Sequence, residues 1–313
     1  KVVGAFAWVL RKFMNISGSE GLVAAGNIFM GMTESPVLIK NYLPTMNRSE
    51  IFLVMVSGMG TIAGSVMGTY IGMLGGTDPA AKVLFATHLL SASVMAVPGS
   101  IVLAKMLCPQ TEEATDHVAI SGKEKENSNI LDAISSGTVT GVKLMTNIAA
   151  MLLVFISLVA LANYITEGVI GRYTGLNDWI VKITDGKAQG LTFQFILGVI
   201  TSPFMWLIGV PSQDIMLVGS LLGQKTILNE FVAYFQLQQW KDAGLFMYEK
   251  SILMSTYILC GFANISSIGI LLGGLGVLAP EKRGLISRIG VPAMIGGALV
   301  SVLSATIIGM ILG

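Results

Sequence analysis

Two carboxylates lie in stretches of sequence that are otherwise almost wholly apolar. Glu34 is found within GNIFMGMTESPVLIKNYL, and Glu230 is found within LLGQKTILNEFVAYFQL. An acidic side chain at the depth of a lipid bilayer is costly, so it marks a binding site or an ion path. A carboxylate can accept two hydroxyl hydrogen bonds at once. Glu230 therefore suits the paired hydroxyls of a sugar diol better than it suits a cation.

Each acid is followed further along the chain by an apolar segment that is interrupted near its middle. The two segments are SGMGTIAGSVMGTY and CGFANISSIGILLGG. The second segment should break as a spanning helix at three polar residues, Asn264, Ser266 and Ser267. Residues 61–65 are the counterpart of this break in the first segment. Unwound backbone frees carbonyl oxygens, which coordinate sodium well. The repeated arrangement predicts a site between internal repeats, as in secondary transporters.

These features also have simpler explanations. Glu34 could lie in water at a hairpin tip beside Lys40, and Glu230 could lie at the surface with Lys225 and Asn229. The serines and the asparagine of the second segment could serve only to join helices, as such residues commonly do in membranes. Three polar residues gathered at one point of an apolar segment favour the site.

The composition is that of an integral membrane protein. Of the 313 residues, 53% are hydrophobic and 12% are charged, whereas soluble domains carry roughly 25% charge. A spanning helix needs about 20 apolar residues, and uncharged stretches cover residues 51–77, 83–104, 144–166, 188–213, 251–280 and 289–313. The net charge of +1 offers no basic surface for nucleic acid. The sequence has no HExxH, GxSxG, P-loop or CxxC motif, so we expect no enzyme activity.

The first part of the chain is predicted to hold four elements. Residues 1–18 are amphipathic but too short and too basic to span, which favours a helix at the membrane surface. The polar break at residues 33–36 divides residues 20–46 into two short helices, a re-entrant hairpin, because proline disfavours helix in the residue before it. Residues 51–74 follow as a broken spanning helix, and residues 82–107 follow as an unbroken one.

The middle of the chain separates two similar halves. It begins with the most polar part of the sequence and continues into a long helix or a pair of helices predicted over residues 132–171, of which the second part would span the membrane. We therefore divide the chain into a surface helix (1–18), a first repeat (19–107), a polar loop with a long helix (108–187) and a second repeat (188–313).

The second repeat follows the order of the first. An apolar stretch at 191–209 and a helix that carries Glu230 towards its end are predicted to form a second hairpin. A broken helix over 245–278 and a last spanning helix over 289–312 complete the pattern.

Four segments give the sequence its resemblance to a known family. They are GNIFMGMTESPVLIKNYL, TIAGSVMGTYI, LLGQKTILNEFVAY and CGFANISSIGILLGGLGVLAP. In this order they resemble the concentrative nucleoside transporter family. The resemblance implies an all-α membrane protein with two re-entrant helical hairpins and two broken transmembrane helices in an inverted repeat. It also implies an elevator-type transport domain, a homotrimer, and N-terminal helices that this chain lacks, so we expect the chain to start inside a longer protein.

The resemblance also implies roles for individual residues. The nucleobase contacts would be Met32, Thr33, Glu34, Val66 and Phe262. The ribose contacts would be Glu230, Asn264 and Ser267. The sodium ligands would be the side chains of Asn27 and Thr61 and the carbonyls of Met30 and Ile62. The family usually has glutamine where this chain has Met32, and methionine cannot make amide hydrogen bonds. The choice between purine and pyrimidine nucleosides therefore stays open.

These assignments predict a secondary active symporter that imports nucleosides, such as uridine or adenosine, along a sodium gradient. It would be a multi-pass protein surrounded by lipid in the plasma membrane (the inner membrane of a bacterium), with no cofactor beyond the coupling ion. Two alternatives stay open. Protons could replace sodium, with Glu34 or Glu230 titrating, or the chain could be a nucleoside-sensing membrane protein that does not transport. The paired hairpins favour transport, because a sensor needs no inverted repeat.

Overall fold

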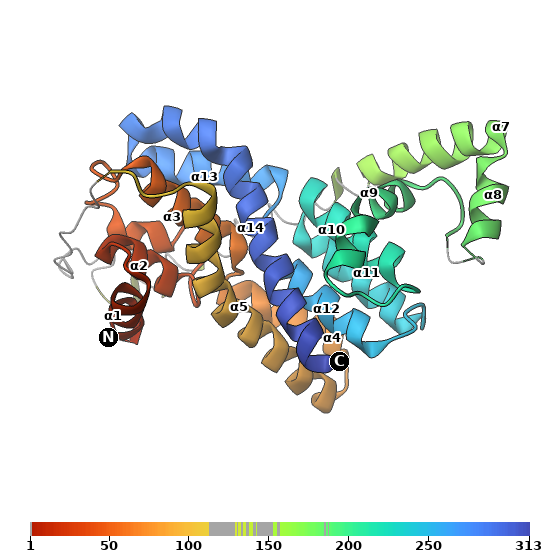
Figure 1. Cartoon of the computed structure of the whole chain (residues 1–313), viewed down its shortest axis with the longest axis horizontal. Helices are drawn as coiled ribbons and strands as arrows, with labels where there is room; N and C mark the ends of the chain where they lie inside the picture. The colour runs from red at the N-terminus through yellow and green to blue at the C-terminus, as the bar shows by residue number, and fades with distance from the viewer. Residues whose placement is uncertain are drawn as a thin grey trace. The chain divides into compact units, whose positions relative to one another are not determined.

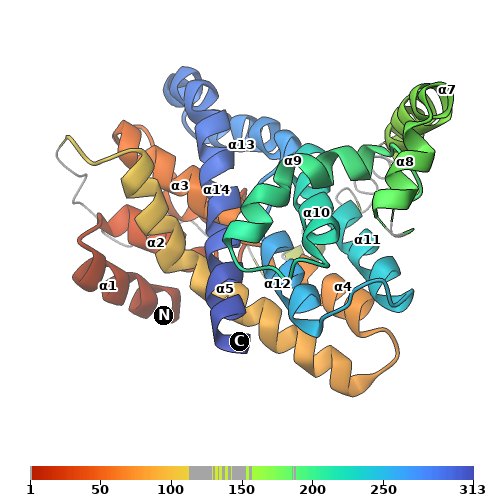
Figure 2. The same ribbon diagram turned by 45° about the vertical axis from the view of Figure 1, so that its right-hand side comes forward.

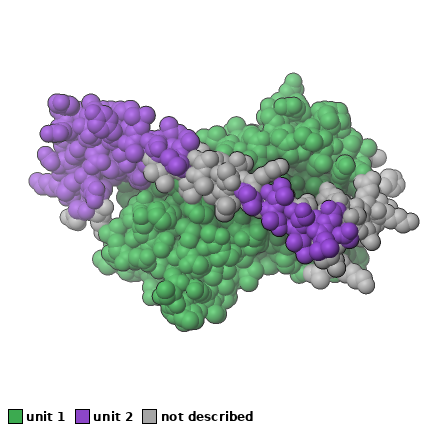
Figure 3. All heavy atoms as spheres, turned by 180° about the vertical axis from the view of Figure 1, so that it is seen from behind, with its two compact units in different colours: residues 1–117, 196–313 green, residues 118–195 purple. Residues whose placement is uncertain are grey.

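A computed structural model gives the fold of the chain (Figure 1 and Figure 2). The structure describes residues 2–112, 129, 131–132, 134–135, 138–139, 142, 153–154, 157–184, 186 and 188–313. All regular secondary structure in these residues is helical, as the predicted all-α class requires. The chain separates into two compact units, which are Lys1–His117 with Ile196–Gly313, and Val118–Phe195 (Figure 3).

The first unit begins with an amphipathic helix, α1 (Val2–Met14). Leu10 and Met14 pack against the core, whereas Trp8 and Phe13 are exposed. A helix with one face on the protein and exposed aromatic residues on another suits a membrane surface. That location stays a prediction.

The first hairpin, hairpin 1, has shorter arms than the sequence suggested. Its first arm is the helix α2 (Gly18–Gly26), which ends before the predicted end at Met32. Turns follow, and the second arm is a short 3-10 helix, η1 (Ser35–Ile39), and further turns rather than an α-helix. The expected second α-helix is therefore wrong. Pro36 lies in the first turn of η1, and Pro44 closes the segment, because proline has no backbone N–H to continue a helix.

The first broken helix follows hairpin 1 as predicted. Its halves are α3 (Arg48–Gly60) and α4 (Gly64–Gly75), and the backbone between them is extended at Thr61 and Ala63. A long unbroken helix, α5 (Pro79–Leu107), comes next and accommodates an internal proline. Together these elements place one helix break in the interior of the first unit.

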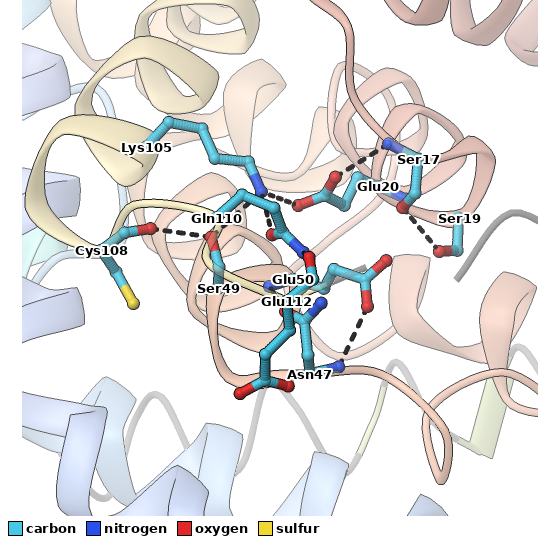
Figure 4. Close-up of polar contacts among 10 residues, drawn as sticks. All are labelled: Ser17, Ser19, Glu20, Asn47, Ser49, Glu50, Lys105, Cys108, Gln110 and Glu112. Carbon is cyan, nitrogen blue, oxygen red and sulfur yellow. Dashed lines mark hydrogen bonds and ion pairs between the residues drawn. The ribbon is translucent and has the colours of Figure 1, made fainter. Parts of the chain in front are cut away.

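A polar network fixes one end of this half (Figure 4). Both α2 and α3 open with capping boxes, whose acids are Glu20 and Glu50. Lys105, in the last turn of α5, donates to Glu20 at 2.6 Å and to the Ser49 hydroxyl at 3.1 Å. Glu20 is almost fully buried, and a buried charge is tolerated where it is paired and hydrogen-bonded. This ion pair joins the end of α5 to the starts of α2 and α3.

From Phe193 onwards the chain consists of helices joined by short turns. They are α9 (Phe193–Leu207), α10 (Ile215–Ile227), α11 (Glu230–Asp242), α12 (Glu249–Leu259), α13 (Ile265–Leu278), η3 (Pro280–Lys282) and α14 (Arg283–Leu312). The predicted break between α12 and α13 and the predicted last helix are both confirmed.

The second hairpin, hairpin 2, differs from the prediction. The helix that was expected to carry Glu230 near its end stops at Ile227, and Glu230 is the first residue of α11. Asn229 caps α11 by accepting a hydrogen bond from the Val232 amide at 2.9 Å. Hairpin 2 therefore consists of α10 and α11, which pack against each other, and α9 precedes it.

Helix α14 is the axis of the first unit (Figure 1). It packs against α3, α5, α12 and α13. A Cβ added at Gly297 would lie 2.8 Å from the Met59 Cβ and 3.0 Å from the Met59 carbonyl carbon. Small residues let membrane helices approach this closely. The core lies on both sides of this contact, as one cluster around α3 and another around α4, α11 and α12.

The two helix breaks also meet each other. Gly261, in the second break, has a φ of +144°, and a Cβ there would lie 2.9 Å from the Met59 carbonyl oxygen and 3.0 Å from that of Gly60. Only glycine tolerates both this backbone conformation and this close approach. The end of α3 and the end of α12 are therefore in direct contact.

Three helical stretches of the described chain are long and apolar enough to cross a membrane. They are Arg48–Gly75, which includes the break between α3 and α4, Pro79–Leu107 and Pro280–Leu312. The first of these stretches contains the first helix break, and the third follows the second broken helix. Length and composition thus agree with the predicted spans at 51–74, 82–107 and 289–312.

The second unit is described only in part. Its helical elements include η2 (Tyr164–Gly171), a π-helix, followed by α7 (Arg172–Thr174) and α8 (Leu176–Ile183). The predicted polar loop and most of the predicted long helix over 132–171 lie outside the described residues.

Candidate functional site

The break between α12 and α13 and the start of α11 bring the second carboxylate into a hydrogen-bond network. Asn264 Nδ2 donates to Glu230 Oε2 at 3.0 Å, and the Tyr70 hydroxyl of α4 donates to Glu230 Oε1 at 3.2 Å. Glu230 is 7% exposed. It also opens α11, where the positive end of the helix dipole favours an anion. The fold thus holds a buried carboxylate with neutral donors and a helix N-terminus.

Asn264 is oriented by the helix that it caps. Its Oδ1 accepts hydrogen bonds from the Ser267 amide at 2.9 Å, the Ser267 hydroxyl at 2.9 Å and the Ser266 hydroxyl at 2.6 Å. With its oxygen occupied in this way, its NH2 group is left to face Glu230. A carboxylate has about four lone-pair sites, and the two protein donors leave acceptor capacity for hydroxyls of a ligand. Of the predicted sugar-binding residues, the structure brings Glu230, Asn264 and Ser267 together.

Tyr70 is part of this network and was missed by the sequence reasoning. Its side chain is fully buried and stacks on Tyr234 with ring centroids 4.2 Å apart. The tilted ring of Phe231 lies 6.1 Å away. The available signal was a tyrosine in the glycine-rich segment directly after the first break. Stacking fixes the ring so that its hydroxyl points at the carboxylate.

The tip of hairpin 1 places the first carboxylate in a different setting. Glu34 and Thr33 are exposed, and Glu34 Oε2 accepts a hydrogen bond from the Gly31 amide at 3.2 Å. A Cβ added at Gly274 of α13 would lie 3.6 Å from Thr33 Cγ2, so this tip lies against α13. No hydrogen bond in the described residues joins Glu34 to Glu230.

The predicted apolar base contacts lie at different depths. Met32 is 7% exposed and belongs to the core cluster around α3, where a Cβ added at Gly58 would lie 2.9 Å from the Met32 Cβ. Val66 is half-buried and packs on the second cluster. Phe262 is half-buried and packs on both clusters. Base contacts from these three residues stay predictions.

Asn27 forms a second polar centre, between hairpin 1 and the first broken helix. It follows the end of α2, and its Nδ2 donates to the Ser57 hydroxyl of α3 at 2.9 Å. Its Oδ1 accepts a hydrogen bond from the Ser35 hydroxyl of η1. The Thr61 hydroxyl donates to the Ser57 carbonyl at 2.9 Å. Asn27 and Thr61, both predicted sodium ligands, are therefore buried, and both form a hydrogen bond with Ser57.

The backbone next to this centre offers further oxygen atoms. The Gly64 amide donates to the Phe29 carbonyl at 3.3 Å, which ties the tip of hairpin 1 to the start of α4. The predicted ligand carbonyls, those of Met30 and Ile62, are one and two residues from this bond. Within the part of the chain that the structure describes, neither carbonyl accepts a hydrogen bond. Amide, hydroxyl and carbonyl oxygens are suitable ligands for a hard cation.

Comparison with known proteins places this arrangement in a family. The family described as "Na+ dependent nucleoside transporter C-terminus" matches residues 88–309, and one described as "Nucleoside recognition" matches residues 1–77. The chain belongs to the concentrative nucleoside transporter family. This confirms the resemblance drawn from the four sequence segments, and the family is one of transporters rather than enzymes.

Individual relatives agree with this membership. The chain is 40% identical to the uncharacterized transporter YutK of Bacillus subtilis, over 96% of this chain and 69% of that protein. It is 38% identical to the sodium/nucleoside cotransporter 1 of Rattus norvegicus, over 99% of this chain and 47% of that protein. The chain thus spans about half the length of the mammalian relative.

A solved relative shows that the fold is shared along the whole chain. The structure of CNTnw in an inward-facing substrate-bound state superimposes with a TM-score of 0.83 at 35% identity, over 100% of this chain and 70% of that one. The fold is therefore that of a concentrative nucleoside transporter. As a family member whose described residues include three helical stretches that could span a membrane, the chain is a multi-pass protein of the plasma or inner membrane.

Proposed function

We propose that this protein is a secondary active symporter that imports nucleosides across the plasma membrane along a sodium gradient. The observation that carries the proposal is the buried Glu230–Asn264 pair at the meeting point of hairpin 2 and the second break. A buried carboxylate with spare acceptor sites, beside the Ser267 hydroxyl, suits the two hydroxyls of a ribose. The family match and the names of the relatives support the same substrate class.

Ribose recognition explains why the site has to be polar at this depth. In the proposed complex Glu230 accepts hydrogen bonds from the ribose hydroxyls, and Asn264 and Ser267 complete the sugar site. Sites that hydrogen-bond a hydroxyl reject analogues that lack it, because the buried groups are then left unpaired. Deoxyribose and dideoxyribose nucleosides should therefore bind progressively more weakly.

Sodium is proposed to bind at the Asn27 centre, outside the sugar site. Its ligands would be the side chains of Asn27 and Thr61 and the carbonyls of Met30 and Ile62. The free carbonyls and the Gly64–Phe29 bond support this assignment. An ion there would fix the tip of hairpin 1, where Thr33 and Glu34 are proposed to contact the base. Coupling then follows, because each ligand favours the hairpin position that the other needs.

The two repeats are proposed to move together as the transport domain of a homotrimer. Residues 19–107 of the first repeat and residues 196–313 of the second share one compact unit with α14 as its axis, which supports their motion as one body. The predicted long helix of the middle section would belong to the scaffold.

Proton coupling is the second candidate, and the burial of Glu230 favours it. The carboxylate is 7% exposed, and its hydrogen-bond partners among the described residues are the neutral side chains of Tyr70 and Asn264. A carboxyl group in that setting could carry the coupling proton. The free oxygen atoms around Asn27 favour sodium, because a proton-coupled protein has no need for them.

Uptake into proteoliposomes tests the proposal. Full-length protein is reconstituted, and radiolabelled uridine and adenosine are supplied under an imposed sodium gradient and, separately, under a proton gradient. Saturable accumulation with sodium is the expected result. Accumulation with protons alone would transfer the coupling role to a carboxyl group. Intact nucleoside binding with no accumulation under either gradient would overturn transport in favour of a sensor.

A further inference from the structure

Lys225 is a buried cation that neither the sugar site nor the sodium site uses. It lies in the last turn of α10, at the tip of hairpin 2, and its side chain is fully buried. No carboxylate in the described residues lies within ion-pair distance of it. A buried ammonium without an ionic partner is costly. Other interactions must therefore offset the cost of burying this ammonium.

The partners of Lys225 are oxygen atoms at the second helix break. Its Nζ donates to the Ile258 carbonyl at 2.8 Å and to the Ser301 hydroxyl of α14 at 2.9 Å. Ser301 in turn donates to the Cys260 carbonyl at 2.8 Å. The last carbonyls of a helix have no partner within the helix. The ammonium thus contacts two carbonyls at the end of α12, that of Ile258 directly and that of Cys260 through the Ser301 hydroxyl.

The local electrostatics favour a positive charge at this point. The negative end of a helix dipole lies at its C-terminus, and α12 ends at Leu259, one residue after the carbonyl that Lys225 contacts. The ammonium therefore lies at the negative end of α12. The ammonium of Lys225 supplies the compensating charge from within the chain.

In the first repeat a hairpin side chain also contacts the last turn of a broken-helix half, but this side chain is neutral. There α2 ends at Gly26 and α3 ends at Gly60, and Asn27 reaches from the hairpin to Ser57 in the last turn of α3. Asn27 and Ser57 are 30 residues apart, and Lys225 and Ile258 are 33 residues apart. A neutral amide thus joins hairpin 1 to the first broken helix, whereas an ammonium joins hairpin 2 to the second.

We propose that Lys225 is a tethered cation that fastens hairpin 2 to the second broken helix, as a bound cation fastens hairpin 1 to the first. Hairpin 2 then needs no ion from solution, and its tip holds Glu230 in place in every state of the cycle. Removal of the ammonium should create a latent site for a small organic cation at Ile258 and Ser301. The consequence for transport rests on the proposed function, whereas the cation site itself does not.

The direct test removes the Lys225 side chain from the purified, full-length protein and supplies the missing atoms as a small molecule in solution. Lys225→Ala removes three methylene groups and the ammonium, which together correspond to n-propylammonium. We expect n-propylammonium to raise the thermal unfolding temperature of Lys225→Ala, and to leave that of the wild type and of Lys225→Met unchanged. Neutral 1-propanol should have no effect on any of them. No stabilisation of Lys225→Ala by n-propylammonium would overturn the latent site.

Lys282→Ala is the matched control. Lys282 also donates to a backbone carbonyl, that of Met46 at 2.8 Å, but it is only partly buried. Its removal leaves a gap open to water, so n-propylammonium should not stabilise this variant. Equal stabilisation of both alanine variants would indicate a general salt effect and would overturn the inference.

Nucleoside binding supplies the functional readout. Lys225→Met should bind uridine or adenosine about 10- to 100-fold more weakly, the effect of losing a charge-assisted contact, and n-propylammonium should restore binding in Lys225→Ala alone. Wild-type affinity in Lys225→Met would overturn the fastening role. A wild type that binds no nucleoside would refute the proposed function, while the unfolding assay would still decide whether the cation site exists.

A milder variant covers the case in which Lys225→Ala does not fold. Ser301→Ala keeps the ammonium and its contact with Ile258 but removes the link to the Cys260 carbonyl. Nucleoside binding should weaken by about 3- to 10-fold, the effect of one neutral hydrogen bond. Unchanged binding would overturn the role of the network.

Discussion

Hairpin 1 and hairpin 2 each contact the last turn of the first half of a broken helix, but the contacting groups differ in charge. Asn27 bridges to Ser57 with a neutral amide, and Lys225 bridges to Ile258 with an ammonium. The tips differ as well, since Glu34 is exposed and Glu230 is buried. Under the proposals made above, hairpin 1 would respond to an ion from solution, whereas hairpin 2 would stay fastened and hold the sugar.

Glu230→Ala should have the largest effect. Loss of the carboxylate leaves the buried donors of Asn264 and Tyr70 unpaired and removes the proposed acceptor of the ribose hydroxyls, so nucleoside uptake should fall about 100-fold or more at every sodium concentration. Radiolabelled uridine uptake measures it, with the exposed Glu281→Ala as control. Near-normal uptake by a well-folded Glu230→Ala would break the assignment of the sugar site to hairpin 2.

Asn27→Ala should act through sodium. The variant loses a proposed ligand and the bridge to Ser57, so the sodium concentration for half-maximal uptake should rise about 10-fold, the effect of one ligand contact. Nucleoside affinity should weaken at limiting sodium and recover at saturating sodium, because coupling is reciprocal. The exposed Asn41→Ala, also in hairpin 1, is the control. An equal loss at all sodium concentrations would remove the distinction between the hairpins.

Tyr70→Phe should produce a moderate loss that does not depend on sodium. The ring still stacks on Tyr234, but one donor to Glu230 is gone, which should weaken nucleoside binding about 5- to 10-fold. Equilibrium binding at several sodium concentrations measures this, and the more exposed Tyr248→Phe is the control. A shift in sodium dependence instead would place Tyr70 with the first centre.

Met32→Gln should have the smallest effect, on selectivity rather than on rate. The amide can donate to and accept from a base where methionine cannot, so the ratio of uridine to adenosine uptake should change about 2- to 3-fold, the effect of a weak net hydrogen bond. Met32 also packs next to Gly58, so thermal unfolding is measured in parallel. An unchanged ratio would assign Met32 to the core alone.

Much of the first repeat could be predicted because its breaks carry local signals. Pro36 marks the tip of hairpin 1, and the glycines around Thr61 mark the first helix break. The second break was predictable from Gly261 and Asn264 in an otherwise apolar segment. The α-helix predicted for the second arm of hairpin 1 is wrong, because Pro36 and Pro44 leave too short a segment between them for an α-helix.

The tip of hairpin 2 was missed because it contains neither glycine nor proline. The chain turns at Leu228 and Asn229, and a single leucine gives no sign of a break. The signal that could have found it is Asn229 followed by Glu230, a helix cap with an acid in the first turn. Without this cap, the run from α10 into α11 reads as one continuous helix.

The polar partners of the site were harder to predict than the acids themselves. Lys225 could be interpreted from sequence as a surface partner of Glu230, but the structure buries it against α12 and α14. Tyr70 lies 160 residues from Glu230. Such contacts depend on which helix ends pack together, and periodicity along a single sequence carries no information about that.

The contact between Gly261 and the end of α3 limits how this protein can be recombined. A chimaera that joins the first half of one family member to the second half of another would bring together a break and a packing surface that were never selected with each other. A β-carbon at position 261 would collide with the Met59 and Gly60 carbonyls, so a compatible donor sequence must keep glycine there. Exchange of single loops on the exterior should be tolerated far more readily than exchange of either half.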